Sequence, residues 1–454
     1  MFIKQFYTNC LAQAAYYVES NGEALIIDPL RDTQPYLSLA RERGAQIRYI
    51  LETHFHADFV SGHLDLARQT GAIIVYGGGA RPSYPALVAN DEEVLSLGKI
   101  QIRVLHTPGH TLESCCYLLL DEQGKESSLF TGDTLFAGDV GRPDLLSGNL
   151  DKEALASMLF DSLNNKIKPL KDDLIIYPGH GAGSACGKHI ARETVTTLGE
   201  QRQTNYALKE LNRQKFIQQV TEGLTSPPAY FFKDAGINAK GYEPLQEVLL
   251  KAETRLVQAD WKNALQEGAI LLDTRPAEQF AKGHAPGAVN IGLNGDFAVW
   301  AGTLLPFGKP LVLFTDKGTE KESVVRLARI GYDTILGCAD LPEDKERSCI
   351  KQIDTETYRK LRQEENSLIL DVRRPSETAL KSLGGALQIP LAELPNRFAE
   401  LDANRKIIVC CAGGYRSMIA ASLLKTFGFN RVCSVAGGID RLEREAPELV
   451  LEQN

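Results

Sequence analysis

The second half of the chain contains an internal repeat, and this repeat limits the folds that it can adopt. AILLDTRPAEQFAKGHAPGAVNIGL at 269–293 is similar to SLILDVRRPSETALKSLGGALQIPL at 367–391. Each copy is followed by an apolar run and a helix-like pattern, at 309–332 and at 405–429. Two copies are too few for a solenoid, so we expect two homologous domains, one after the other.

The repeated segments alternate between strand-like and helix-like patterns. The short apolar runs LILDV at 368–372 and IIVCC at 407–411 are bounded by turn residues and predict strands. The run SMIAASLLKTF at 417–427 predicts a helix, with Gly428 at its C-terminal cap. Because strands that alternate with helices form parallel sheets, each copy is expected to be a small α/β domain.

The length of 454 residues suits three domains of roughly 150 residues each. The two copies of the repeat are 98 residues apart, measured from Asp273 to Asp371. The segment 221–244 is rich in Gly and Pro and is expected to join or cap the first domain. We therefore predict three domains, at 1–245, 246–346 and 347–454.

Composition and charge exclude several classes of protein. The formal net charge of −8 argues against general binding to nucleic-acid phosphates. No apolar stretch reaches about 18 residues, so no membrane-spanning helix is expected. The first residues lack the pattern of a signal peptide. The nine cysteines are odd in number and scattered, which does not predict a disulfide framework. A reducing cytoplasm is therefore the expected location.

Seven of the eight histidines lie between His54 and His189. Four clusters contain side chains that can bind metals: THFHADFVSGH at 53–63, HTPGHT at 106–111, FTGDTLF at 130–136 and YPGHG at 177–181. Each follows an apolar run, so each is expected in a loop at the end of a strand, where sites are commonly built. A lone histidine is more often an ordinary core or surface residue, but four such clusters predict a metal site.

At these positions the chain resembles the metallo-β-lactamase superfamily, whose pattern is H-x-H-x-D-H, a distant His, a bridging Asp and a final His. The matching residues are His54, His56, Asp58, Phe59, His110, Asp133 and His180. The resemblance implies an αββα fold for the first domain. Phe59 departs from the pattern, because hydrolases with two metals carry a histidine ligand there. Since phenylalanine cannot coordinate a metal, the second metal site lacks a ligand.

What remains is a set of ligands for one metal: His54, His110 and Asp133. Two histidines and one carboxylate with open positions opposite them are typical of non-haem Fe(II) oxygenases. With GDTLFAGDVGRPDL at 132–145, about the first 245 residues resemble the persulfide dioxygenases of this superfamily. The resemblance implies one Fe(II) per chain, held by those three residues. It also implies three side chains that orient the ligands or the substrate: His56, Asp58 and His180.

Arg142 and Cys186 lie in loops that follow predicted ligands. Arg142 either stabilises the GRPDL loop through a carboxylate or faces an anionic substrate; both interpretations stay open, and it is kept as a candidate substrate-binding residue. Cys186 follows His180 closely enough to reach a substrate channel, although a loop cysteine without a role is the preferred interpretation. No chemistry is predicted for Cys115 and Cys116 in their apolar run, or for His63 and His189 near helix starts.

The second copy of the repeat carries CAGGYR at 411–416, between a predicted strand and a predicted helix. This sequence matches C-x-x-G-x-R, the active-site pattern of rhodaneses. Such a loop directs backbone N–H groups inward and forms an anion cup. Gly413, Gly414 and Arg416 are the candidate substrate-binding residues of this cup. The helix N-terminus and Arg416 favour a thiolate at Cys411, which can carry sulfane sulfur as a persulfide. Cys410 is expected to be a buried structural residue.

The first copy also resembles a rhodanese, because GHAPGAVNI at 283–291 is close to the N-terminal signature of that family. However, Asp316 occupies the position of the nucleophile, and Thr319 and Lys321 replace the second glycine and the arginine of the loop. A carboxylate cannot carry sulfane sulfur. We therefore predict an inactive spacer or docking module; the alternative, Asp316 as a working acid or base, has no supporting partner in the sequence.

Together the resemblances imply one sulfur pathway. A low-molecular-weight persulfide and O2 would give sulfite and thiol at Fe(II), and Cys411 would transfer sulfane sulfur to sulfite to give thiosulfate, or run in reverse. The thiol carrier stays open among glutathione, coenzyme A, bacillithiol and others. A homo-oligomer is expected, because related enzymes are often oligomers. The alternatives are a dinuclear zinc thioester hydrolase resembling glyoxalase II, and a sulfur-carrier protein whose first domain is only a scaffold.

Overall fold

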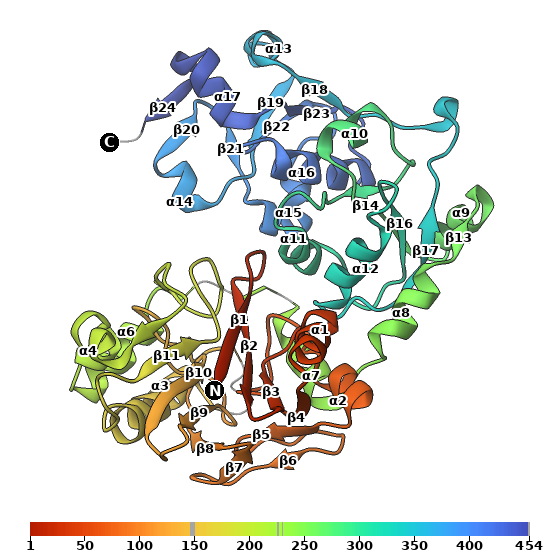
Figure 1. The fold of residues 1–454 in the computed structure, drawn as a ribbon. Coiled ribbons are helices and arrows are strands. Elements are labelled where there is room, and N and C mark those ends of the chain that lie inside the picture. The colour runs from red at the N-terminus through yellow and green to blue at the C-terminus, as the bar shows by residue number, and fades with distance from the viewer. Residues whose placement is uncertain (146–149, 225–226, 229, 453–454) are drawn as a thin grey trace. The chain divides into compact units, whose positions relative to one another are not determined.

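The computed structural model describes residues 1–454 except 146–149, 225–226, 229 and 453–454. The chain divides into two compact units (Figure 1). Unit 1 comprises 1–246 together with 327–331, and unit 2 comprises 247–326 together with 332–454. Each unit has sheets and a hydrophobic core of its own.

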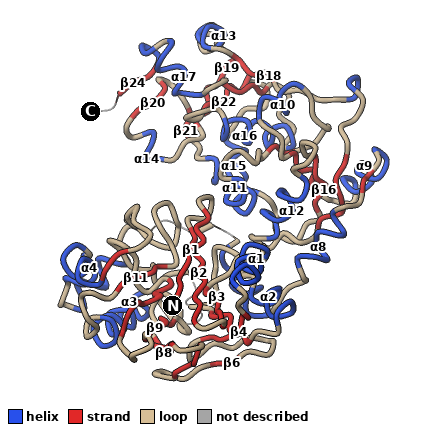
Figure 2. Tube along the Cα trace, viewed as in Figure 1, coloured by secondary structure: helices blue, strands red, loops and turns tan. Residues whose placement is uncertain are grey.

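Unit 1 contains two six-stranded sheets, whose strands are drawn in red in Figure 2. The first has its strands in sequence order: β1 (Phe2–Thr8), β2 (Gln13–Ser20), β3 (Glu23–Ile27), β4 (Gln46–Leu51), β5 (Ile73–Tyr76) and β6 (Leu87–Val88). The second has the order β12-β11-β10-β9-β8-β7, with β7 (Val94–Leu97), β8 (Ile100–His106), β9 (Cys115–Leu120), β10 (Glu126–Gly132), β11 (Ile175–Pro178) and β12 (Thr196–Thr197).

Helices cover the outer faces of these sheets. The described helices of unit 1 are α1 (Gln34–Arg43), α2 (His63–Thr70), α3 (Lys152–Ser162), η1 (Leu163–Ile167), α4 (Leu198–Thr204), α5 (Tyr206–Lys209), α6 (Arg213–Thr221) and α7 (Phe231–Lys240). Helix α8 (Leu245–Ala252) begins in unit 1, and most of its residues belong to unit 2. Across the whole described part of the chain, none of the helices has both the length and the apolar character that crossing a membrane requires.

The alternation of side chains along β2 shows how the layers are held together. Ala14, Tyr16 and Val18 point into a core between the two sheets. Ala15 and Tyr17 point to the opposite face, into a core that α1 and α2 cover. A third core lies between the second sheet and helices α3 to α6. The order helix, sheet, sheet, helix is the αββα fold predicted for the first domain.

Unit 2 contains two five-stranded sheets in which all the pairings between described strands are parallel. The first has the order β13-β17-β16-β14-β15, with β13 (Arg255–Leu256), β14 (Ile270–Asp273), β15 (Val289–Asn290), β16 (Leu311–Phe314) and β17 (Ile335–Ala339). The second has the order β18-β23-β22-β19-β21, with β18 (Lys351–Ile353), β19 (Ser367–Asp371), β21 (Leu387–Gln388), β22 (Lys406–Cys410) and β23 (Val432–Val435). The two orders are equivalent strand for strand, which confirms the predicted repeat of α/β domains.

The helices of unit 2 connect these strands, and a small sheet pairs β20 (Lys381–Leu383) with β24 (Val450–Glu452). The α-helices are α9 (Gln258–Gln266), α10 (Ala277–Lys282), α11 (Phe297–Leu304), α12 (Glu320–Ala328), α13 (Thr355–Leu361), α14 (Pro375–Thr378), α15 (Leu394–Arg397), α16 (Tyr415–Thr426) and α17 (Gly438–Glu445). The 3-10 turns are η2 (Asp344–Glu346), η3 (Leu391–Glu393), η4 (Phe398–Glu400) and η5 (Pro447–Leu449).

Helix α16 is the helix predicted at 417–427, and it begins two residues earlier. The reason is Gly414, whose left-handed backbone, with φ of 97°, turns the chain directly from β22 into the helix. The register between strands places Asp371, at the end of β19, beside Cys410, at the end of β22. The loops that follow β19 and β22 therefore lie at the same edge of the sheet, where sites in parallel α/β domains form.

Candidate functional site

Each predicted metal-binding cluster begins where a strand of unit 1 ends. His54 follows β4, and His110 lies in the loop between β8 and β9. Asp133 follows β10 directly, and His180 comes two residues after the end of β11. Strand β4 belongs to the first sheet and the other strands belong to the second. The site therefore lies where the strand ends of two packed sheets meet.

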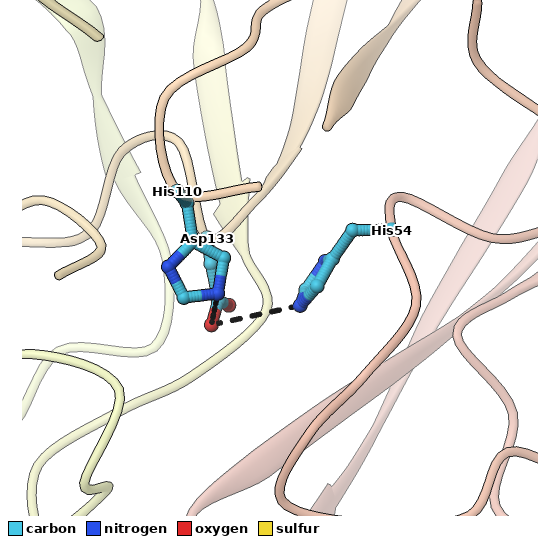
Figure 3. A group of neighbouring side chains, drawn as sticks. All are labelled: His54, His110 and Asp133. Carbon is cyan, nitrogen blue, oxygen red and sulfur yellow. Dashed lines mark ion pairs between the residues drawn. The ribbon is translucent and has the colours of Figure 1, made fainter. Parts of the chain in front are cut away.

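Figure 3 shows His54, His110 and Asp133 pointing toward one another. Nε2 of His110 is 3.4 Å from Oδ2 of Asp133, and Nε2 of His54 is 4.0 Å from the same oxygen. All three side chains are buried, and one ligand atom from each lies within 4.8 Å of the others. Oδ2 of Asp133 has no hydrogen-bond partner among the described residues. Because an unpaired buried carboxylate oxygen is costly, this arrangement fits a bound metal cation.

The hydrogen bonds of the two histidines leave Nε2 available as a metal ligand. Nδ1 of His110 donates to the carbonyl oxygen of Arg142, 2.9 Å away, because a carbonyl can only accept. The hydroxyl of Thr53 donates to Asp28 at 2.8 Å, so Nδ1 of His54 must donate to that hydroxyl, 3.0 Å away. Both Nδ1 atoms therefore carry the proton, and both Nε2 lone pairs are free for a metal.

The charges around the site favour the forms of these side chains that bind metals. Burial lowers the pKa of His54 well below its usual range, and the nearby His56 adds to this effect. Burial by itself would raise the pKa of Asp133, but the charge and hydrogen bond of His180 hold it well below its usual range. A neutral imidazole and an ionised carboxylate are the ligand forms.

His180 is held between two carboxylates. Its Nδ1 lies 2.7 Å from Oδ1 of Asp133, and its Nε2 lies 2.8 Å from Oδ2 of Asp58. Burial opposes protonation of His180, but the charges of Asp133 and Asp58 raise its pKa well above its usual range. Both ring nitrogens of His180 are therefore engaged by carboxylates, which is the kind of contact that an orienting residue makes.

His56 faces a pair of buried acids that the sequence reasoning did not identify. Its Nε2 is 3.1 Å from Oδ1 of Asp28 and 3.6 Å from Oε2 of Glu52. Burial lowers the pKa of His56, but Asp28 and Glu52 together raise it to about 9. Phe59 is fully buried and stacks on His56, with ring centroids 4.3 Å apart. Asp28 and Glu52 each follow a strand directly, and that position is the signal by which they could have been found.

The structure places Cys186 beside two residues of the predicted site, Asp58 and His180. Its sulfur and ligand atoms of Asp58 and His180 all lie within 4.8 Å of one another, and all three residues are buried. Burial, followed by the charges of Asp58 and Asp133, raises the pKa of the Cys186 thiol well above its usual range. The loop after β11 folds back because the amide N–H of Arg142 donates to the carbonyl oxygen of Cys186, 2.9 Å away.

The guanidinium of Arg142 binds protein groups, which favours the first of its two interpretations. Nε and Nη2 donate to the two oxygens of Asp144 at 2.7 and 2.8 Å, and Nη1 donates to the carbonyl oxygen of Ala185 at 3.2 Å. Arg142 therefore ties the GRPDL loop to the segment that carries Cys186. Its candidacy as a substrate-binding residue loses its basis, because the fork that would bind an anion is occupied by a carboxylate.

In unit 2, Cys411 comes directly after β22 and lies at the N-terminus of α16. Its Sγ accepts hydrogen bonds from the N–H groups of Gly414 and Ser417, both at 3.2 Å. Ser417 lies outside the sequence pattern, and was therefore missed. Gly413 is exposed at the mouth of the loop. Cys410 points away into the hydrophobic core, as expected of a structural residue.

Arg416 does not present a free charge to a substrate. Its Nη1 and Nη2 donate to the two oxygens of Glu377 at 2.6 and 2.7 Å. The hydrogen bonds and charge of Arg416 lower the pKa of Glu377 to about 2. The sequence reasoning missed Glu377, because its distance of 39 residues from Arg416 gives no local signal. The predicted support that Arg416 gives to a thiolate is therefore shared with a neighbouring carboxylate.

The equivalent loop of the first copy has no sulfur nucleophile. Asp316 lies shortly after β16, where Cys411 follows β22 in the second copy. One of its oxygens accepts a hydrogen bond from Gln279 at 3.3 Å. The N–H and hydroxyl of Thr319 donate to the carbonyl oxygen of Asp316 at 3.0 and 2.8 Å. These hydrogen bonds hold the loop at the position that corresponds to Cys411, where the side chain is a carboxylate.

Both halves of the chain match known families. Residues 8–180 match the metallo-beta-lactamase superfamily, and residues 257–337 and 354–445 match the rhodanese-like domain. A probable hydroxyacylglutathione hydrolase of Schizosaccharomyces pombe is 32% identical over 187 residues, which are 40% of this chain and 69% of that protein. A hydroxyacylglutathione hydrolase of Polaromonas sp. is 33% identical over 162 residues, which are 35% of this chain and 57% of that protein.

A solved structure resembles more of the chain. The crystal structure of a metallo-beta-lactamase from Staphylococcus aureus subsp. aureus COL is 35% identical, with a TM-score of 0.67, and the match covers 75% of this chain and 99% of that one. The chain belongs to the metallo-beta-lactamase superfamily. Its superfamily domain is followed by two rhodanese-like domains. The chain spans only 57% of the Polaromonas hydrolase.

We predict that metal binding requires a glycine at position 141. A Cβ on Gly141 would lie 2.1 Å from the carbonyl oxygen of Asp133 and 2.9 Å from Nδ1 of His110. Gly141→Ala should therefore displace the support of two ligands and weaken metal binding by about 10-fold to 100-fold. Competition between the protein and a chelator, followed by elemental analysis, measures the change.

Gly78→Ala is the matched control, because its Cβ would meet only ordinary contacts, at 3.6 Å and beyond. This variant should bind metal as the wild type does. Wild-type metal affinity in Gly141→Ala would contradict the assignment of His110 and Asp133 as ligands.

Proposed function

We propose that the superfamily domain is a mononuclear non-haem Fe(II) persulfide dioxygenase. The observation that carries the proposal is the pairing of a complete set, His54, His110 and Asp133, with Phe59 at the position of a second-metal ligand. Two histidines and one carboxylate are the ligand type of non-haem Fe(II) oxygenases. Bound Fe(II) would supply open positions where O2 and a persulfide anion react. The balanced reaction is R–S–SH + O2 + H2O → R–SH + SO3²⁻ + 2 H⁺.

The residues of the chain prepare this site in three ways. The Nδ1 hydrogen bonds of His54 and His110 fix the tautomer in which Nε2 is the ligand. His180 holds one oxygen of Asp133, which turns the other oxygen toward the two histidines. Burial of the ligands restricts their contact with water, so the charges inside the site interact strongly.

A dinuclear thioester hydrolase is the second candidate, because the named relatives are hydroxyacylglutathione hydrolases. A second metal would require ligands on the other side of Asp133. Asp58, His180 and Cys186 lie there, but both nitrogens of His180 are bonded to carboxylates. Phe59 adds no ligand atom. The mononuclear site is therefore the better-supported proposal, and a sulfur-oxidising domain also has a use for the rhodanese-like domain that follows it.

A sulfur carrier in which the superfamily domain is only a scaffold is the third candidate. Such a protein has no need for a metal site, and burying a carboxylate oxygen without a cation or a hydrogen bond costs free energy. Oδ2 of Asp133 is a buried oxygen of this kind. The intact ligand set counts against this candidate.

We propose that Cys411 is the residue that transfers sulfane sulfur. Its thiolate would attack the terminal sulfur of a persulfide, form a Cys411–S–S⁻ persulfide and release the thiol. Attack of sulfite on the outer sulfur would give thiosulfate and restore the Cys411 thiolate. The N–H groups of Gly414 and Ser417 support the sulfur anion in both states. The same steps in reverse would make persulfide from thiosulfate and thiol.

Removing one ligand tests the metal site. His110→Ala takes away one of three protein ligands, so persulfide-dependent oxygen uptake should fall to background. Sulfur transfer from thiosulfate should stay near the wild-type rate, because Cys411 lies in the other compact unit. An oxygen electrode and a sulfurtransferase assay on the same sample measure both. Two zinc ions per wild-type chain, with activity that survives iron chelation, would contradict the proposal.

Exchange of Cys411 for serine separates the two activities. Serine keeps the size of the side chain but is a far weaker nucleophile at neutral pH. Cys411→Ser should keep oxygen uptake, while the product shifts from thiosulfate toward sulfite. Chromatographic separation of the two anions measures the shift. Enzymatic thiosulfate formation at the wild-type rate would show that Cys411 is not the carrier, and Cys186 or Cys410 would then be examined.

In contrast to Cys411, Asp316 is expected to be dispensable for both activities. Asp316→Ala should change neither activity by more than about twofold, because its carboxylate cannot carry sulfane sulfur. Asp316→Cys alone should not create a transferase, since Thr319 and Lys321 also differ from the active loop. The same two assays measure both variants. A loss in Asp316→Ala as large as that of Cys411→Ser would show that Asp316 is a working residue.

A further inference from the structure

Tyr415 of the sulfur-transfer loop is anchored in the first rhodanese-like domain. It lies in the chain between Gly414 and Ser417, whose N–H groups donate to Sγ of Cys411. Its own hydroxyl donates to the carbonyl oxygen of Gly292, at 2.8 Å. Gly292 belongs to the other copy of the repeat but to the same compact unit. The loop that holds the reactive sulfur is thus tied to the copy that lacks one.

The ring of Tyr415 occupies a slot that requires a glycine. A Cβ on Gly295 would lie 2.5 to 2.8 Å from three atoms of this ring. The φ of Gly295 lies outside the left-handed region that favours glycine. The need for glycine at position 295 therefore comes from the ring of Tyr415. Gly292 forms the neighbouring part of the slot, where a Cβ would be 3.5 Å from the ring.

A second contact holds the same helix farther along. The N–H of Asn290, in β15, donates to the hydroxyl of Ser422 at 3.0 Å. Ser422 lies in α16, about two turns after Tyr415. Helix α16 therefore rests on β15 and the following segment at two points. Its first turn supplies the donors to Cys411, so its position fixes where those donors point.

We propose that the first rhodanese-like domain is the platform for the sulfur-transfer loop, with Tyr415 as the positioning residue. The anchor keeps the Gly414 and Ser417 N–H groups directed at Sγ of Cys411. Such an anchor is needed because Gly414 has φ of 97° and, as a glycine, gives the loop conformational freedom. Preorganised donors support a sulfur anion only while they are held in place. The inference rests on the proposed role of Cys411.

Four full-length variants test the anchor. Gly295→Ala, a substitution in the first rhodanese-like domain, displaces the ring of Tyr415 from its slot. Tyr415→Phe removes only the hydrogen bond to Gly292, and Tyr415→Ala removes the ring. The double variant Gly295→Ala with Tyr415→Ala has no ring to displace. Tyr332→Phe is the control, because it removes a tyrosine hydroxyl that donates within the first rhodanese-like domain, to the carbonyl oxygens of Leu305 at 2.7 Å and Ala301 at 3.4 Å.

Two readouts report on the loop rather than on folding alone. The first is the rate of iodoacetamide alkylation of Cys411, followed on its own peptide by mass spectrometry. The second is sulfur transfer from thiosulfate to cyanide, separated into kcat and KM. Cys411–S⁻ takes sulfur from S2O3²⁻ and releases SO3²⁻, and the persulfide then gives SCN⁻ with cyanide. Thermal unfolding of each variant is measured beside them.

Gly295→Ala and Tyr415→Ala should lower both the alkylation rate and kcat by about tenfold, since they loosen hydrogen bonds to a sulfur anion. Tyr415→Phe should retain most of both, because its ring still fills the slot. In the Tyr415→Ala background, Gly295→Ala should add less than about twofold. Tyr332→Phe should match the wild type in both readouts, whatever its effect on the unfolding temperature.

Wild-type alkylation and kcat in Gly295→Ala, with a lowered unfolding temperature, would overturn the inference and leave the slot as simple packing. Full additivity of the two substitutions would overturn it as well. The alkylation readout does not depend on the proposed reaction. If the wild type transfers no sulfur, the proposed role of Cys411 fails, while alkylation still decides whether the first rhodanese-like domain positions the loop.

Discussion

The division of the Asp133 carboxylate between two partners is the constraint on which the metal site depends. One oxygen is bound by His180, at 2.7 Å, and the other faces His110 and His54 without a hydrogen bond. Asp58 binds the other nitrogen of His180, and the charges of the two carboxylates together raise the pKa of His180. Asp58, His180 and Asp133 therefore form a buried series of oppositely charged neighbours. The series ends at Oδ2 of Asp133, the oxygen that is left to bind a metal cation.

Much of the fold followed from patterns that are local in the sequence. The repeat predicted two equivalent parallel sheets, and the structure confirms them strand for strand. The polar clusters after apolar runs predicted side chains at strand ends, which is where His54, His110 and Asp133 lie. Periodicity and strand-end position carry this information because one sheet brings the ends of its strands to one edge.

Partnerships across loops could not be predicted in the same way. The pairing of Arg416 with Glu377, of Arg142 with Asp144 and Ala185, and the approach of Cys186 to Asp58 all depend on how loops fold back. Arg142 and Arg416 were candidates for binding a substrate, and a carboxylate partner was the other interpretation of Arg142; in the structure each guanidinium binds a carboxylate. A sequence shows that an arginine can bind an anion, but only the folded chain shows which anion occupies its fork.

We propose that this superfamily domain oxidises persulfides at one iron and does not hydrolyse thioesters at two zinc ions. The most direct measurement compares both activities on one iron-loaded sample. Oxygen uptake is measured with the persulfides of glutathione, coenzyme A and bacillithiol. Hydrolysis of a hydroxyacylglutathione thioester and the metal content, by elemental analysis, are measured on the same sample. The account predicts persulfide-dependent oxygen uptake with one iron per chain and no thioester hydrolysis. Thioester hydrolysis with two metals per chain, and no oxygen uptake with any persulfide, would contradict it.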